Sequence, residues 1–199
     1  MNSKPADDKK RASIGARRSP ETEAAILDAA ETLLREGGLA NFSIEAVARR
    51  ARAGKPTIYR WWPNKTRLLL DVYLRQKTSM ESIDTGSIEG DCLALLEGLL
   101  ASWKSGAGHV FRSVFAEAQN DEAAAEALRD YAADRRAVTG RLFERASMRG
   151  ELADDADPAI AAELIAAYAW SRLLTGRLEA SRQELEATVR QMLRGVLKR

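Results

Sequence analysis

Hydrophobic positions along the chain recur with helical spacing, and no stretch alternates strictly between apolar and polar residues as a surface strand would. The first periodic run begins at Ser19 and Pro20, an N-cap residue followed by a proline at the first helical position. It carries apolar residues such as Ile26 and ends at Gly37 and Gly38. The pattern therefore predicts a capped amphipathic helix at the start of an α-helical protein.

Two short helices joined by a tight turn are predicted between residues 43 and 62. Ser43 caps the first, which is amphipathic and reaches Arg50, and the pattern breaks over residues 52–54. Pro56 opens the second helix because proline cannot continue a helix from upstream. A helix this short needs neighbours to hold it. The arrangement is typical of a helix-turn-helix, and a longer helix follows it from Asn64 to about residue 80.

The remaining two thirds of the chain are also helical in pattern. The predicted helices cover about residues 92–103, 111–115, 121–150, 158–175 and 181–197, with a break at Gly106 and Gly108. We therefore predict an all-α fold of about nine helices. It consists of a three-helix N-terminal domain (residues 20–66) that contains the helix-turn-helix, and a C-terminal helical bundle (residues 67–199). Residues 1–19 are basic and almost without apolar side chains, so we expect a disordered arm.

The formal net charge of +2 hides an asymmetry. Residues 1–70 carry 14 basic and 8 acidic side chains, whereas the rest carry 17 and 21. A basic first third followed by an acidic remainder is expected of a nucleic-acid-binding domain joined to another module. A basic tail on an ordinary enzyme would give the same split. The arm itself is either a solvated tail or a contact for DNA phosphates or the minor groove.

Several classes of chemistry are disfavoured by composition. The single cysteine, Cys92, cannot form an intramolecular disulfide, and the single histidine, His109, leaves no zinc-ligand cluster. No nucleophile elbow or glycine-rich phosphate loop is present, so we expect neither an enzyme nor a cofactor or metal site. No membrane-spanning run or secretion signal is present, and we expect a cytoplasmic protein.

The helix-turn-helix region resembles the TetR family of bacterial transcription regulators. The resemblance rests on residues 26–30 (ILDAA), 42–48 (FSIEAVA) and 54–65 (GKPTIYRWWPNK), and it covers about residues 20–75. It implies that Lys55, Pro56, Thr57 and Tyr59 lie on a recognition helix in the DNA major groove. It also implies that Ser43 and Lys65, each at a helix start, meet phosphates.

Some roles in this region have two readings. The exposed face of the second short helix would offer Arg60 to DNA beside Lys55 and Thr57, but Arg60 is also a common solvated charge. Tyr59 is either a phosphate contact or a core aromatic. Arg52 stands in the turn where the family usually has glycine. It is either strained at a positive φ by roughly 1 kcal/mol, or it sits in a reshaped turn and adds a phosphate contact.

The C-terminal region resembles the family's ligand-binding domains only loosely. The resemblance implies a ligand pocket, for which the candidates are Trp103, Phe111, Phe115 and Tyr131, although aromatic residues of a bundle are commonly core. His109, near a helix break, either faces this cavity or is partly exposed.

The last two helices carry small and apolar faces that we interpret as a packing surface. The resemblance implies a two-fold four-helix dimer interface there, with Leu164, Tyr168, Val189 and Met192 as candidates. Pairing two helix-turn-helices doubles the DNA contacts and fixes the spacing of two half-sites.

We therefore expect a homodimeric repressor that binds a palindromic operator on double-stranded DNA and is released by a small, largely apolar organic effector. The alternative is a constitutive or partner-controlled DNA-binding protein without a sensor. A fully packed C-terminal bundle would favour that alternative, whereas a cavity would favour the sensor.

Overall fold

The computed structural model describes residues 19–76 and 83–194, and the elements formed by these residues are helices, which confirms the predicted fold class. Most of the expected basic arm, residues 1–18, lies outside the described residues, as do the predicted helical residues 77–80 and 195–197. Within the described ranges, no helix is both long and apolar enough to cross a membrane.

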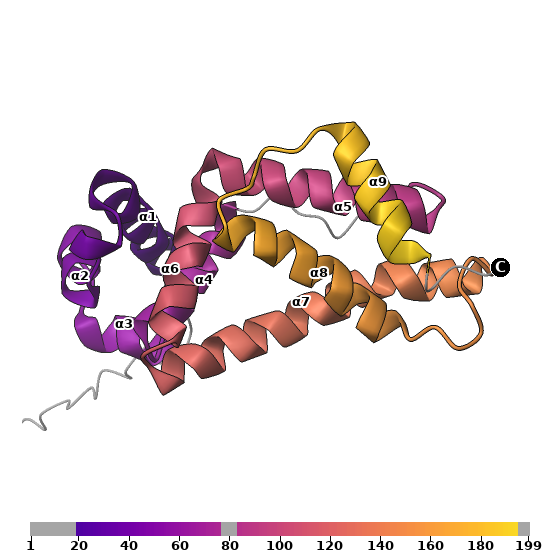
Figure 1. The fold of residues 1–199 in the computed structure, drawn as a ribbon. Helices are drawn as coiled ribbons and strands as arrows, with labels where there is room; N and C mark the ends of the chain where they lie inside the picture. The colour runs from indigo at the N-terminus through magenta and orange to yellow at the C-terminus, as the bar shows by residue number, and fades with distance from the viewer. Residues whose placement is uncertain (1–18, 77–82, 195–199) are drawn as a thin grey trace, which may run out of the picture.

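The N-terminal helices form one end of the molecule (Figure 1). They are α1 (Pro20–Gly37), α2 (Ile44–Ala51), α3 (Lys55–Trp61) and α4 (Lys65–Gln76), with a short 3-10 turn, η1 (Leu39–Asn41), after α1. α1 packs on both α2 and α4, and α2 packs on α3. The short helix α3 is thereby held by its neighbours, as its length required.

The C-terminal region is built from α5 (Ile88–Ser102), α6 (Gly108–Ala118), α7 (Glu122–Met148), α8 (Pro158–Leu174) and α9 (Arg182–Leu193). The long α7 runs along one side with α8 beside it, and α9 lies on α5 (Figure 1). α6 packs between α4 and α7 and connects the two parts of the chain.

Helix starts follow the capping residues. Side-chain oxygens accept a hydrogen bond from a backbone N–H of the first turn at Ser19, Ser43, Ser87, Asp121, Asp157 and Ser181. Each of these contacts satisfies a backbone donor that the helix itself cannot. The starts predicted at Ser19 and Ser43 are therefore confirmed in position and in mechanism, and the helices predicted from about residues 158 and 181 begin at the expected places.

The predicted break at Gly106 and Gly108 is confirmed as a kink between two helices. A short turn, η2 (Trp103–Ala107), joins α5 to α6, and the backbone of Gly106 within it is not helical. Gly106 has φ 125°, a value that favours glycine. Gly108 lies inside α6, where a Cβ would come within 2.8 Å of the carbonyl oxygen of Trp103. Both glycines are needed, one for its conformation and the other for a close approach.

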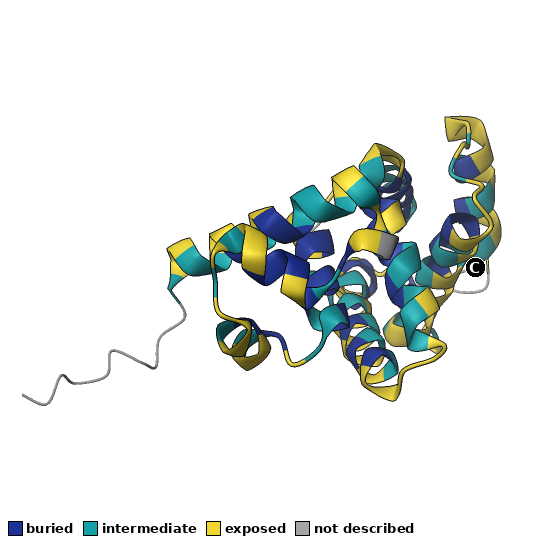
Figure 2. Ribbon diagram, turned by 90° about the vertical axis from the view of Figure 1, so that its left-hand side faces the viewer, coloured by how far each residue is buried: buried dark blue, intermediate teal, exposed yellow. Residues whose placement is uncertain are grey.

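Buried residues form a continuous core that runs from the N-terminal helices to the far end of the bundle (Figure 2). Cys92 is part of this core, and burial beside Asp91 raises the pKa of its thiol to about 12. A thiol that stays protonated and covered is unreactive. The burial of Cys92 therefore favours a structural role in the core over a role as a redox sensor.

Candidate functional site

The helix-turn-helix consists of α2, residues 52–54 and α3. Ile58, on the inner side of α3, is fully buried, and Trp62 directly after α3 is 1 % exposed. The indole Nε1 of Trp62 donates to Asp71 on α4 over 2.7 Å. Arg50 donates two hydrogen bonds to Glu36, which brace α2 against α1. These contacts fix α3 on the domain while its outer side faces solvent.

The outer side of α3 carries the predicted recognition residues. Lys55, Pro56, Tyr59 and Arg60 are exposed, and Thr57 is half-buried. Tyr59 is 46 % exposed, so the structure does not support its alternative interpretation as a core aromatic. An exposed row of hydroxyl, ammonium and guanidinium groups on one short helix can reach phosphates and base edges in a major groove.

Lys55 is already paired within the domain. Its Nζ lies 2.7 Å from Oε1 of Glu45 on α2, and this contact raises the pKa of the ammonium group and lowers that of the Glu45 carboxyl. Both side chains are more than half exposed. Because such surface pairs contribute little, a DNA phosphate can take the place of Glu45. Ser43 uses its oxygen as the cap of α2, accepting from Ala46, which leaves its O–H able to donate.

Arg52 adopts the left-handed conformation, with φ 52° and ψ 35°. It is the one non-glycine residue with positive φ among the residues that the structure describes. Arg52 therefore adopts the strained conformation with positive φ that was one of its two predicted alternatives. Its backbone N–H donates to the carbonyl oxygen of Ala48 and so caps α2. The side chain is exposed, so a phosphate contact is compatible with the strain.

We expect Arg52→Gly to raise the free energy of unfolding by about 1 kcal/mol, because glycine adopts this conformation without strain. Chemical denaturation followed by circular dichroism measures this difference. Arg52→Ala is the matched variant, since it removes the guanidinium but keeps the strained Cβ. An Arg52→Gly protein no more stable than Arg52→Ala would contradict the assignment of strain.

Lys65, at the start of α4, has a partner that the sequence did not indicate. Its Nζ lies 2.9 Å from Oε2 of Glu117 on α6. Asn64 caps α4 through Arg67 N–H and also donates to the carbonyl oxygen of Ala123 at the start of α7. The beginning of α4 is thereby tied to α6 and α7. A phosphate contact by Lys65 has to compete with Glu117.

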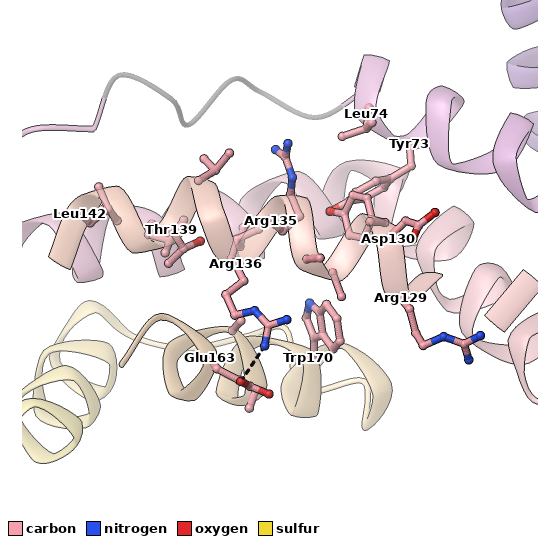
Figure 3. Close-up of a pocket in the computed structure, with 18 of the residues that line it drawn as sticks. Tyr73, Leu74, Arg129, Asp130, Arg135, Arg136, Thr139, Leu142, Glu163 and Trp170 are labelled. Atoms are coloured by element: carbon pink, nitrogen blue, oxygen red, sulfur yellow. Dashed lines mark hydrogen bonds and ion pairs between the residues drawn. The ribbon is translucent and has the colours of Figure 1, made fainter. Parts of the chain in front are cut away.

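A cavity of about 860 Å³ lies in the C-terminal region, where α4, α5, η2, α7 and α8 meet (Figure 3). Its apolar wall includes Leu95, Leu99, Trp103, Tyr131 and Trp170. Its charged and polar side chains are Arg129, Asp130, Arg135, Arg136, Thr139 and Glu163. The size and the mixture of aromatic wall and few polar groups are those of a small-molecule site.

α4 forms part of this cavity through Tyr73 and Leu74. Trp103 Nε1 donates to the Tyr73 hydroxyl over 3.0 Å, and the Tyr73 ring stacks on Phe111 with centroids 4.6 Å apart. Burial raises the pKa of Tyr73 and of Tyr131, so both hydroxyls stay neutral. The helix that follows the helix-turn-helix is thus a wall of the cavity.

Comparisons with known proteins identify both regions. Residues 26–72 match the family model described as "Bacterial regulatory proteins, tetR family", and residues 82–192 match "Tetracyclin repressor-like, C-terminal domain". The chain is 32 % identical over 184 residues to the HTH-type transcriptional regulator YdeS of Bacillus subtilis, covering 92 % of this chain and 93 % of that one. The chain belongs to the TetR family.

Two further comparisons agree with this family assignment. The DNA-binding transcriptional repressor TetR of Mycobacteroides abscessus is 29 % identical over 162 residues, which cover 80 % of this chain and 85 % of that one. A crystal structure of the TetR family transcription regulator SCO0332 superposes with a TM-score of 0.74 at 28 % identity, covering 89 % of this chain and all of that one. The protein is therefore a helix-turn-helix transcription regulator of a non-enzymatic family.

The TetR family fold brings together only part of the residues predicted for the ligand pocket. Trp103 and Tyr131 line the large cavity, whereas Phe111 is fully buried behind them and Phe115 packs against Phe111. His109 is exposed on α6 and lines a separate cavity of about 790 Å³. Phe111, Phe115 and His109 are therefore not among the residues that line the large cavity. Phe111 and Phe115 lie behind its wall, where their rings pack on Tyr131 and Trp170.

The residues predicted for a dimer interface differ in how far they are exposed on the surface of the chain. Leu164 is 52 % exposed on α8, and Tyr168 is half-buried with its hydroxyl accepting from Arg172. Val189 is fully buried and Met192 packs on the core, because the apolar stripe of α9 covers α5 within the same chain. Val189 is removed from the interface for this reason.

Several residues that line the cavity, Arg135 and Trp170 among them, were not among the candidates predicted from the sequence. A signal for Arg135 was present. It occupies the same helical stripe as Tyr131, Val138 and Leu142, at spacings of four, three and four residues. A basic residue in an otherwise apolar stripe indicates a polar requirement inside the fold.

Proposed function

We propose that this TetR family regulator is a repressor that binds a palindromic operator as a homodimer and is released by a small organic effector. The observation that carries the proposal is the position of α4. Its first residue, Lys65, belongs to the DNA-binding domain, and Tyr73 near its end forms part of the wall of the large cavity. A ligand that changes the position of α4 would change the spacing of two recognition helices.

The cavity supports this function over a constitutive DNA-binding protein. A bundle without a sensing function is most stable when its interior is completely packed. A cavity of about 860 Å³ lowers the stability of the bundle, so its presence favours a ligand-binding role. The repressor assignment is further supported by the likeness to the M. abscessus protein, which is named a repressor.

An exposed apolar row on α8 supports the homodimer. Ile160, Leu164 and Leu174 are 59 %, 52 % and 50 % exposed, and the exposed Ala167 and Ser171 lie between them. The five positions follow one another at spacings of four, three, four and three residues, the spacing of a helix seam. A second copy of α8 would cover this row.

We expect Leu164→Glu to convert the dimer into a monomer, because it places a charge in the middle of the proposed seam. Analytical ultracentrifugation measures the mass of each species, at the same protein concentration for all variants. Ala25→Glu adds the same charge to an exposed position on α1 and should remain dimeric. A wild-type protein that sediments as a monomer, or a dimeric Leu164→Glu variant, would contradict this interface.

We expect Lys65→Ala to weaken binding to every duplex and to lower the slope of affinity against salt by about one, because one phosphate contact is lost. Fluorescence anisotropy over a range of salt concentrations gives the slope. Lys104→Ala, which removes an equal charge from the C-terminal region, should leave the slope unchanged. An unchanged slope in Lys65→Ala would show that Lys65 keeps its pair with Glu117 on DNA.

A further inference from the structure

We infer that the large cavity takes an organic carboxylate, with the carboxylate held by Arg135 and an apolar body against the aromatic wall. The inference rests on the proposed function and specifies its effector class. It starts from the charges that line the cavity and from which of them are already neutralised.

Among the residues that the structure describes, each charged group lining the cavity except Arg135 has an ion-pair partner. Arg136 pairs with Glu163 across the α7–α8 contact at 3.2 Å, and Figure 3 shows this pair beside Trp170. Two other lining residues pair with groups outside the cavity, Arg129 with Glu122 and Asp130 with Arg67. Arg135 has no carboxylate within ion-pair distance among the residues that the structure describes.

The environment of Arg135 is costly for an unpaired cation. Its guanidinium carbon lies 5.8 Å from the centroid of the Tyr131 ring, a favourable cation–π contact. Its Nε, however, is buried without a hydrogen-bond partner among the residues that the structure describes. A buried donor that lacks a partner costs about 1–3 kcal/mol. An apolar side chain at this position of the α7 stripe would avoid that cost, so a ligand that engages the guanidinium from the cavity would explain the arginine.

The geometry of the guanidinium selects a carboxylate. Its parallel N–H groups match the two oxygens of a carboxylate, and one unpaired arginine balances one negative charge. A phosphate dianion carries one negative charge more than this arginine balances. The wall beside Arg135, which includes Tyr131, Leu99 and Trp103, is apolar and suits an aromatic or aliphatic body.

The position of Arg135 also connects such a ligand to the DNA-binding domain. Arg135 and Arg136 leave α7 in different directions: Arg136 reaches α8, whereas Arg135 extends toward the end of α4 near Leu74 (Figure 3). A carboxylate bound there would lie next to the helix whose first residue is Lys65.

The test compares acids with neutral amides of nearly the same shape, using naphthylacetate with naphthylacetamide and octanoate with octanamide. Isothermal titration calorimetry on the full chain gives the affinities. In at least one pair the acid should bind about tenfold to a hundredfold more tightly than the amide, the usual effect of a hydrogen-bonded charge. Arg135→Met should abolish this preference, and Arg135→Lys should retain only part of it.

Arg129→Met is the matched control, since it removes an arginine from the same cavity whose partner lies outside it. It should keep the preference for the acid. Thermal unfolding of each variant checks that the fold is intact. The inference is overturned by equal binding of acid and amide, by a preference that survives in Arg135→Met, or by failure of all four compounds to bind at millimolar concentration.

A mobility-shift assay with the same compounds separates this inference from the proposed function. An amide that releases DNA as well as its acid would overturn the carboxylate assignment and leave effector release standing. An acid that binds through Arg135 without releasing DNA would support the carboxylate site and contradict effector release.

Discussion

Replacing Trp62 with alanine is expected to lower the free energy of unfolding by about 3–5 kcal/mol, the usual cost of truncating a fully buried tryptophan. Trp62 is 1 % exposed, and its indole donates to Asp71 on α4. The substitution therefore opens a cavity beneath α3 and leaves the Asp71 carboxylate without this donor. Since α3 is too short to hold its own conformation, specific DNA binding should be lost with it.

Trp61 provides the matched control for this prediction. It is adjacent in sequence, and the two rings meet edge to face with centroids 5.8 Å apart, but Trp61 is only half-buried. Trp61→Ala should cost about 1 kcal/mol. Urea unfolding followed by circular dichroism compares the two variants. An equal loss of unfolding free energy in the two variants, or a larger loss in Trp61→Ala, would contradict the assignment of Trp62 as the core tryptophan of the domain.

Replacing Tyr59 with alanine is expected to weaken operator binding by about tenfold to a hundredfold, the range for a direct contact in a protein–DNA interface. Tyr59 is the large side chain that α3 exposes at the centre of its outer face, beside Lys55 and Arg60. Because the side chain is exposed, the free energy of unfolding should change by less than about 0.5 kcal/mol. Tyr59→Ala should therefore lower the affinity for the operator without lowering the stability of the protein, whereas Trp62→Ala should lower both.

Tyr59→Phe distinguishes the two contacts that the ring and the hydroxyl can make. A phosphate contact through the hydroxyl predicts that phenylalanine binds the operator as weakly as alanine. A contact between the ring and the bases predicts that phenylalanine keeps most of the affinity. Mobility-shift titration on an operator duplex and on an unrelated duplex measures both effects. Wild-type affinity in Tyr59→Ala would contradict the placement of α3 in the groove.

The helices were predictable because their signals are local. Ser43 and Asp157 stand immediately before the helices that they cap, and Gly38 ends α1 at a positive φ. The break between α5 and α6 has an equally local signal. Gly106 has φ 125°, which lies outside the helical range and favours glycine, so the chain turns between the two helices at this residue.

The site was predictable only where the helix-turn-helix pattern is specific. The pairing of Lys65 with Glu117 joins residues 52 positions apart, and no local pattern encodes such a contact. Likewise, the apolar stripe that contains Val189 is the same whether it covers the chain's own core or a second copy. Only the packing of α9 on α5 decides between these two surfaces.

We propose that this TetR family regulator recognises a specific palindromic sequence with two copies of α3. The decisive experiment is selection of bound sequences from a random duplex pool, followed by sequencing. We expect an enriched palindrome whose half-site centres lie about 34–36 Å, or a multiple of that distance, apart along the duplex. No enrichment, or enrichment of a single site without two-fold symmetry, would contradict it.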